Sequence, residues 1–201
     1  FADGYSCAAV GFDRPDWLAV TQTPSATDLT ALINRATRST LISRDLKCTR
    51  VEWPASRGIS RPLLNGLQAT GTEAVIVTKR GVPNWQSTTG NLLAVQTPGG
   101  SQPLIVNDPL DAAVPGRPTV VGLRQRILSE AVFGSLATKS TNEHQPSILI
   151  VDPRFDPGTV SGSPLESALN SAVVNRKNLA AALRTPTAGY AGAVPDYPSV
   201  A

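Results

Sequence analysis

The chain has 201 residues, of which 41% are hydrophobic and 16% are charged, and this composition excludes a disordered or fibrous protein. Its 18 basic and 15 acidic residues give a net charge of +3 without a dense basic cluster, which argues against nucleic acid as a partner. No run approaches the roughly 18 apolar residues of a membrane-spanning helix, so we expect membrane attachment only through segments outside this chain.

Both cysteines, Cys7 and Cys48, lie near the start of the chain. The chain begins at Phe1 and contains no methionine, so we expect an upstream segment that this sequence lacks. The even cysteine count favours one disulfide formed in an oxidising compartment. It would close a loop of about 40 residues and stabilise the fold by on the order of 4 kcal/mol. Two unpaired buried thiols or a metal-binding pair are the alternatives.

The first half of the chain alternates between helical and strand patterns. Apolar residues at helical spacing predict a helix over 25–38, and strand-forming residues predict a strand over 46–53. Ser60 and Pro62 are typical of a helix start, and Gly71 ends this second helix. The continuous apolar run at 74–77 predicts a strand that is covered on both faces.

The second half repeats this alternation. Short apolar runs predict strands over 92–95 and 103–106, and a long helix is predicted over 119–137. The run 147–151 has the pattern most typical of a buried strand. The SPLE sequence at 163–166 forms a capping box, which predicts a helix through Leu169 and Val173 toward Leu183, before Pro186.

This alternation predicts an α/β fold, with a mostly parallel sheet and flanking helices. About five strands are too few for a complete eight-stranded barrel, so we expect an open sheet or an incomplete barrel. We expect a single α/β domain over residues 1–185, followed by a Pro- and Gly-rich linker or tail over 186–201.

The sequence lacks the residues and motifs of several enzyme classes. His144 is the single histidine, which leaves too few histidine ligands for a self-contained zinc site. The same residue would have to serve any Ser-His-Asp triad. No GxSxG elbow, phosphate-binding loop or GxGxxG motif is present. We therefore expect no metal and no cofactor.

Three carboxylates fall where predicted strands end, and ligand sites of α/β sheets lie at such ends. These candidate catalytic residues are Glu52, Asp108 and Asp152. Arg154 and Asp156 follow closely and are candidates for binding. A converging pair of carboxylates would suit hydrolysis of a glycosidic bond. The alternative is that these residues only form the turns that end strands, because Asp residues that precede proline commonly do so.

Two tryptophans are candidates for stacking on a sugar ring or on a partner surface. Trp85 lies in a polar, turn-rich segment, where we expect its ring to be exposed. For Trp53 we favour packing in the core, although it follows a candidate catalytic residue and is retained as a binding candidate.

Five segments stand out by their order and spacing: FDRPDW (12–17), DLTAL (28–32), VEWPASRGISRPLLNGLQATGTEAVIV (51–77), GLRQRILSEAVF (122–133) and ILIVDPRFDPG (148–158). Together they resemble an uncharacterised family of exported, membrane-anchored cell-envelope proteins of actinobacteria. The resemblance implies an extracytoplasmic domain similar to a polysaccharide-deacetylase or glycosidase barrel, encoded near a peptidoglycan-precursor flippase. Working deacetylases use a histidine pair for a metal, and this chain has only His144, so no ligand set carries over.

These observations lead to one main hypothesis and two alternatives. We expect an extracytoplasmic cell-envelope domain that binds a glycan or an envelope protein in wall biogenesis, without catalysis. The first alternative is a carbohydrate-active hydrolase that uses the three carboxylates. The second is a structural or assembly protein, whose tail would extend onto a neighbouring chain.

Overall fold

A computed structural model describes residues 7–11, 15–43, 47–54, 59–78, 81–82, 91–107, 120–141, 146–150, 164–172, 174, 178–184 and 188–189. The chain divides into two compact units. Unit 1 comprises Phe1–Gln86, Leu92–Val106 and Asn178–Ala201, and unit 2 comprises Ser87–Asn91 and Asn107–Lys177.

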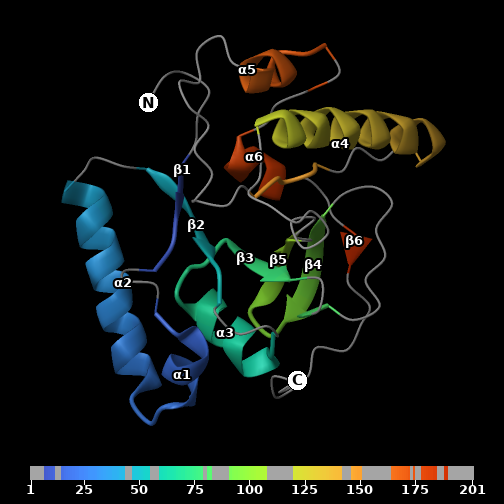
Figure 1. Ribbon diagram of the computed structural model, residues 1–201. Helices are drawn as coiled ribbons and strands as arrows, with labels where there is room; N and C mark the ends of the chain where they lie inside the picture. Colours follow the sequence, from blue (N-terminus) through green and yellow to red (C-terminus); the bar gives the residue numbers. More distant parts are fainter. Residues whose placement is uncertain are drawn as a thin grey trace. The chain divides into compact units, whose positions relative to one another are not determined.

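The centre of unit 1 is a six-stranded sheet with the order β1-β2-β3-β5-β4-β6 (Figure 1). The strands are β1 (Cys7–Ala9), β2 (Cys48–Glu52), β3 (Ala74–Thr78), β4 (Leu92–Thr97), β5 (Gly100–Asn107) and β6 (Ala188–Gly189). The pairs β1–β2, β2–β3 and β4–β6 are parallel, and β4–β5 is antiparallel. The predicted α/β fold with a mostly parallel sheet is confirmed, and the sheet does not close into a barrel.

Three helices connect the parallel strands of this unit. Helices α1 (Trp17–Gln22) and α2 (Ala26–Ser43) lie between β1 and β2 in the chain, and α3 (Arg61–Ala69) lies between β2 and β3. Helix α1 contacts both α2 and α3, so the two crossovers lie on the same face of the sheet (Figure 1). This arrangement gathers all three helices beside β2.

Helix α3 begins and ends where its sequence predicts. The Ser60 side chain caps the helix by accepting a hydrogen bond from the Leu63 N–H at 3.4 Å, and a proline stands in the first turn. Beyond its end, Gly71 has a φ of 78°, a left-handed conformation that favours glycine.

The hydrophobic core of unit 1 lies between α3 and the sheet. Leu63, Leu64 and Leu67 of α3 are buried against the inner residues of β3, β4 and β5. Trp17 at the start of α1 belongs to the same cluster. Burying a Leu or Val side chain contributes about 1.5–3 kcal/mol, so these residues supply most of the driving force for this unit.

Strands β4 and β5 form a hairpin with Pro98 and Gly99 in its turn, because Thr97 and Gly100 are paired. The sequence predicts both strands. The Gln68 side chain of α3 lies against this turn and accepts a hydrogen bond from the Thr97 hydroxyl. The end of α3 therefore fixes the position of the turn.

In unit 2, α4 (Val120–Thr141) packs against α5 (Pro164–Leu169). The prediction of a buried strand over 147–151 is wrong for its described residues, since 146–150 are not in a strand and Leu149 is 36% exposed. The Asn91 side chain takes the place of a neighbouring strand. Its amide oxygen accepts from the Ile148 N–H at 2.7 Å, and its amide nitrogen donates to the Ile148 carbonyl at 2.7 Å.

The long helix predicted from the SPLE capping box is also wrong in its extent. Helix α5 ends at Leu169, and a separate helix, α6 (Leu179–Leu183), begins after Asn178. The Asn178 side chain caps α6 by accepting from the Ala181 N–H at 2.7 Å. Several Asn and Ser residues lie in the sequence between α5 and α6, and these residue types favour caps and turns over helix interiors.

Among the described residues, no helix is long and apolar enough to cross a membrane.

Candidate functional site

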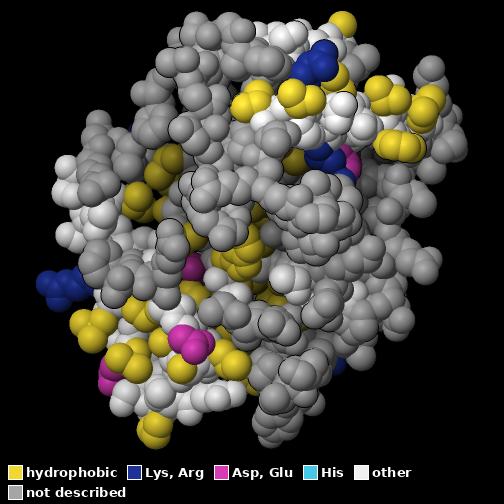
Figure 2. Space-filling view, in the orientation of Figure 1, with side chains coloured by type: hydrophobic (Ala, Val, Ile, Leu, Met, Phe, Trp, Pro, Cys, Tyr) yellow, Lys and Arg dark blue, Asp and Glu magenta, His cyan; other side chains and the backbone are white. Residues whose placement is uncertain are grey.

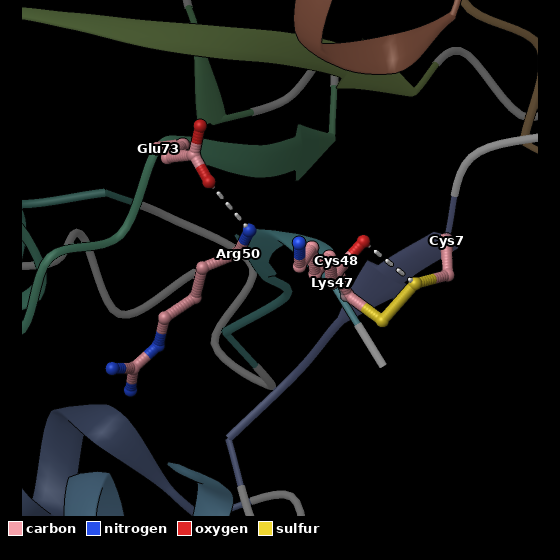
Figure 3. Close-up of a disulfide and its surroundings, with 5 residues drawn as sticks. All are labelled: Cys7, Lys47, Cys48, Arg50 and Glu73. Atoms are coloured by element: carbon pink, nitrogen blue, oxygen red, sulfur yellow. Dashed lines mark hydrogen bonds between the residues drawn. A yellow bond between two sulfur atoms is a disulfide. The ribbon is translucent and has the colours of Figure 1, made fainter. Parts of the chain in front are cut away.

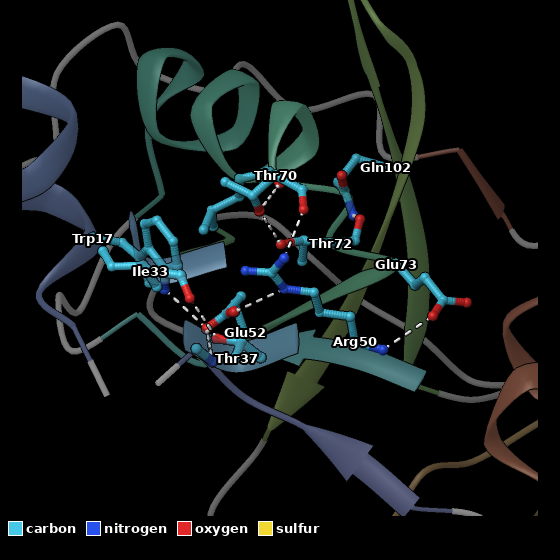
Figure 4. A network of polar contacts seen from close by, with 11 residues as sticks. Trp17, Ile33, Thr37, Arg50, Glu52, Thr70, Thr72, Glu73 and Gln102 are labelled. Atoms are coloured by element: carbon cyan, nitrogen blue, oxygen red, sulfur yellow. Dashed lines mark hydrogen bonds and ion pairs between the residues drawn. The ribbon is translucent and has the colours of Figure 1, made fainter. Parts of the chain in front are cut away.

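The carboxyl end of β2 carries the one predicted catalytic residue that the structure describes. Glu52 is 2% exposed, and one of its carboxylate oxygens, Oε2, accepts two hydrogen bonds (Figure 4). The Gly11 N–H donates at 3.0 Å and the Trp17 indole N–H donates at 2.8 Å. This carboxylate therefore joins β2 to the residues after β1 and to the start of α1.

Arg50, two residues earlier on β2, neutralises this buried carboxylate. Its Nε lies 3.5 Å from Oε1 of Glu52, and its Nη1 donates to the Thr70 carbonyl at 2.7 Å (Figure 4). The remaining Nη2 is buried and has no hydrogen-bond partner among the described residues. Since Arg50 and Glu52 alternate with Val51 along the strand, both project from the same face of the sheet.

The backbone of Arg50 is fixed as well. Its N–H donates to Oε1 of Glu73 at 3.0 Å, and its carbonyl accepts from the Glu73 N–H at 2.8 Å. Both the side chain and the main chain of Arg50 are thus tied to the residues that join α3 to β3. A short polar layer continues from there: Thr70 and Thr72 lie with their hydroxyls 2.9 Å apart, and Gln102 Nε2 donates to the Thr72 carbonyl at 3.4 Å.

Sequence reasoning missed this polar network. The Thr70 hydroxyl donates to the Leu67 carbonyl, which is an ordinary contact at a helix end. The sequence around Thr70 does not indicate that an arginine from a strand binds the Thr70 carbonyl. The one available signal was the alternation of Arg50 and Glu52 on a predicted strand, which indicates a shared face.

The hydrogen bonds of Glu52 define what it does in this structure. Both oxygens face donors, so the carboxylate connects three segments of unit 1. Its predicted role as an acid or nucleophile needs a second carboxylate in the same cleft. The other candidates, Asp108 and Asp152, lie outside the described residues, and the catalytic role stays a prediction.

Trp53 directly follows this buried group and is 46% exposed, so the predicted core packing is wrong. The physical reason is that Trp53 lies just past the last residue of β2, and strand alternation does not account for it, since Thr49 and Val51 on the face opposite Glu52 are buried. Three further binding candidates, Trp85, Arg154 and Asp156, lie outside the described residues.

The predicted disulfide between Cys7 and Cys48 is confirmed (Figure 3). The two cysteines are direct partners in the parallel β1–β2 pair, with their Cα atoms 4.7 Å apart and a sequence separation of 41. The bond therefore joins the edge strand of the sheet to its neighbour.

Across the described ranges, no group of three or more His, Cys, Asp or Glu residues is placed to hold a metal ion. The single histidine, His144, is not in those ranges.

Hydrophobic side chains also lie exposed on helices α2 and α4 (Figure 2). Leu32 and Ile42 of α2 are more than half exposed, and on α4 so are Val121, Phe133 and Leu136. Single exposed apolar residues are common on protein surfaces, but several on one helix indicate a surface that could contact a partner.

The fold and this site define a disulfide-linked α/β protein in which the candidate carboxylate Glu52 is hydrogen-bonded within the protein. The chain matches no protein-family model, no curated protein and no solved structure. The resemblance to exported cell-envelope proteins accordingly stays a prediction.

Proposed function

We propose that this chain is an extracytoplasmic domain of a cell-envelope protein, and that it binds a glycan or an envelope protein without catalysing a reaction. The observation that carries the proposal is the contrast between two adjacent residues. Glu52 is buried with both carboxylate oxygens facing donors, whereas the Trp53 ring is exposed. A bonded carboxylate beside an exposed aromatic ring suits binding better than bond cleavage.

The disulfide supports the extracytoplasmic part of the proposal. Such bonds form and persist in secreted and periplasmic compartments and are rare in the cytosol of mesophiles. Because Cys7 and Cys48 are direct strand partners, the bond belongs to the folded sheet and is not an accidental contact on the surface.

The exposed Trp53 supports the binding part. An indole ring offers a large apolar face and a polar N–H, a combination that suits the stacking of sugar rings and the anchoring of protein partners. The backbone just before Trp53 is fixed through the Glu52 side chain, so the ring is presented from a rigid strand end.

Co-sedimentation with insoluble cell-wall polysaccharide tests whether the protein binds a glycan. We expect the wild-type protein to sediment with the polymer and Trp53→Ala to lose about tenfold in affinity, with a smaller loss for Trp53→Phe. Leu32→Ala removes an apolar side chain of α2 that is more exposed than Trp53, 62% against 46%, and should bind like the wild type.

A photoreactive amino acid at position 53 tests the protein arm in cells that export the chain. A discrete cross-linked envelope protein, absent when the same probe stands at position 42, supports a protein partner. If neither arm gives Trp53-dependent binding, the proposal fails. If the wild type releases sugar from the polymer and Glu52→Gln does not, the hydrolase alternative replaces it.

A further inference from the structure

The segment over residues 7–11 lies at the edge of the sheet of unit 1 and outside its hydrophobic core cluster. It contains β1, a strand of three residues that is paired with β2 at the edge of the sheet. Ala9 is buried, yet neither it nor any other residue of this segment belongs to the hydrophobic core cluster. Release of β1 would therefore expose little of the apolar surface that holds unit 1 together.

Two contacts fasten the ends of this segment. At one end, the Cys7–Cys48 disulfide joins directly paired residues, and both cysteines are partly exposed. At the other end, the Gly11 N–H donates to the buried Glu52 carboxylate at 3.0 Å. The fit there is close, since a Cβ on Gly11 would lie 3.1 Å from Glu52 Oε1 and 3.1 Å from the Trp17 ring.

We propose that the Cys7–Cys48 disulfide is a redox latch, whose reduction releases residues 7–11 from β2 while the rest of unit 1 stays folded. This three-residue edge strand contributes no residue to the core cluster, so its ladder hydrogen bonds, the Gly11–Glu52 contact and the covalent bond hold it in place. Once the covalent bond is broken, only hydrogen bonds remain, and a short edge segment held in this way opens locally at low cost.

The reductant is a dithiol. One of its thiolates attacks a sulfur of the disulfide, whose two cysteines are partly exposed, and forms a mixed disulfide; the other cysteine leaves as a thiolate and is protonated. The second thiol of the reductant then resolves the mixed disulfide. The products are two cysteine thiols in the protein and one disulfide in the reductant, so atoms and electrons balance.

Opening the latch changes the site at the end of β2. Glu52 loses the Gly11 donor and keeps the Trp17 indole and the Arg50 guanidinium. The outer edge of β2 becomes free to pair with another strand. The latch is a property of the fold alone and does not depend on what Trp53 binds.

Hydrogen exchange of the full chain, oxidised and then treated with dithiothreitol, tests the latch. We expect the amides of residues 9–11 to exchange at least about tenfold faster after reduction, while α3 and β3 keep their protection. The variant Cys7→Ser/Cys48→Ser should show the same local change without any reductant, and reoxidation of the wild type should reverse it.

Four results would overturn the proposal. Unchanged protection of residues 9–11 after complete reduction would show that β1 stays bound without the bond. Loss of protection throughout α3 and β3, or failure of the double serine variant to fold, would show that the whole of unit 1 needs the disulfide to stay folded. Reduction only in the presence of denaturant would show that a dithiol cannot reach the bond in the native protein.

Discussion

The indole N–H of Trp17 donates to the Glu52 carboxylate at 2.8 Å, and both side chains are almost completely buried. This bond links the first residue of α1 to the last residue of β2. Since Trp17 also belongs to the hydrophobic core cluster, the same ring contributes apolar packing and satisfies a buried charge.

Replacement of Glu52 should therefore cost stability. Glu52→Ala leaves the Arg50 charge and the Trp17 and Gly11 donors without an acceptor, and we expect a loss of about 3–5 kcal/mol in the free energy of unfolding. Glu52→Gln keeps the shape and one acceptor oxygen, so about 1–3 kcal/mol is expected. Urea denaturation measures both values. A Glu52→Gln variant as stable as the wild type would contradict an electrostatic role for the carboxylate.

The close contact between α1 and α3 gives a second prediction. A Cβ on Gly66 would lie 2.7 Å from Cγ2 of Thr21, whose rotamer is held by a hydrogen bond from its hydroxyl to the Leu18 carbonyl. Gly66→Ala should thus destabilise by about 1–3 kcal/mol, although alanine favours helices. Thr21→Ser removes the clashing methyl group and keeps the hydroxyl.

The double variant Gly66→Ala/Thr21→Ser should recover most of the loss, which a double-mutant cycle measures by denaturation. If the serine does not rescue the alanine, Gly66 and Thr21 are not in direct contact across the two helices.

Two glycines in open space should respond with opposite signs. Gly71 has a φ of 78° and no atom of the described residues within 4 Å of an added Cβ, so Gly71→Ala should destabilise by about 1 kcal/mol through backbone strain. Gly134 lies within α4, where the described part of the chain also places no atom within 4 Å, and Gly134→Ala should stabilise that helix by about 0.5–1 kcal/mol.

Thermal denaturation of both variants gives the comparison. Gly71→Asn is the matched control, because asparagine tolerates the left-handed region better than alanine and should lose less. A stabilising Gly71→Ala variant would be inconsistent with a left-handed backbone at this residue.

Asn91 should control the local stability of residues 146–150. Asn91→Ala removes the partners of both the N–H and the carbonyl of Ile148, and we expect a loss of about 1–2 kcal/mol together with faster exchange of the Ile148 amide. Asn91→Asp keeps the acceptor for the N–H and loses the donor to the carbonyl. Its Ile148 amide should stay more protected than in the alanine variant, as hydrogen exchange would show.

The elements predicted best are those whose local signals agree with one another. Helix α3 has a capping serine, an early proline and a closing glycine, and β3 is a short continuous apolar run, so pattern and turn chemistry indicate the same boundaries. The disulfide followed from the number of cysteines, whereas its exact strand register required the structure.

The elements predicted worst depend on distant partners. Residues 146–150 have the composition of a buried strand, but the backbone N–H and carbonyl of Ile148 bond to the side chain of Asn91, 57 positions away. Strand β1 has only three residues, too few for a periodic pattern, and its pairing comes from β2 far along the chain. Local periodicity carries no information on such contacts.

At the candidate site, sequence reasoning located Glu52 at a strand end and failed on Trp53. It treated the tryptophan as one more apolar residue of a strand, although the strand ends at Glu52 and Trp53 lies beyond it, 46% exposed. The partners of Glu52 come from an early glycine and from a helix start, and neither position carries a recognisable motif.

The covalent bond at Cys7 also decides how β1 is aligned. It joins residues that lie directly opposite each other, and thereby permits only one offset between the two strands. A shift of a single position would turn Ala9 outward and carry the Gly11 N–H away from Glu52, because neighbouring residues of a strand face opposite sides. Oxidation of this cysteine pair thus selects one alignment among several that a three-residue strand would otherwise sample.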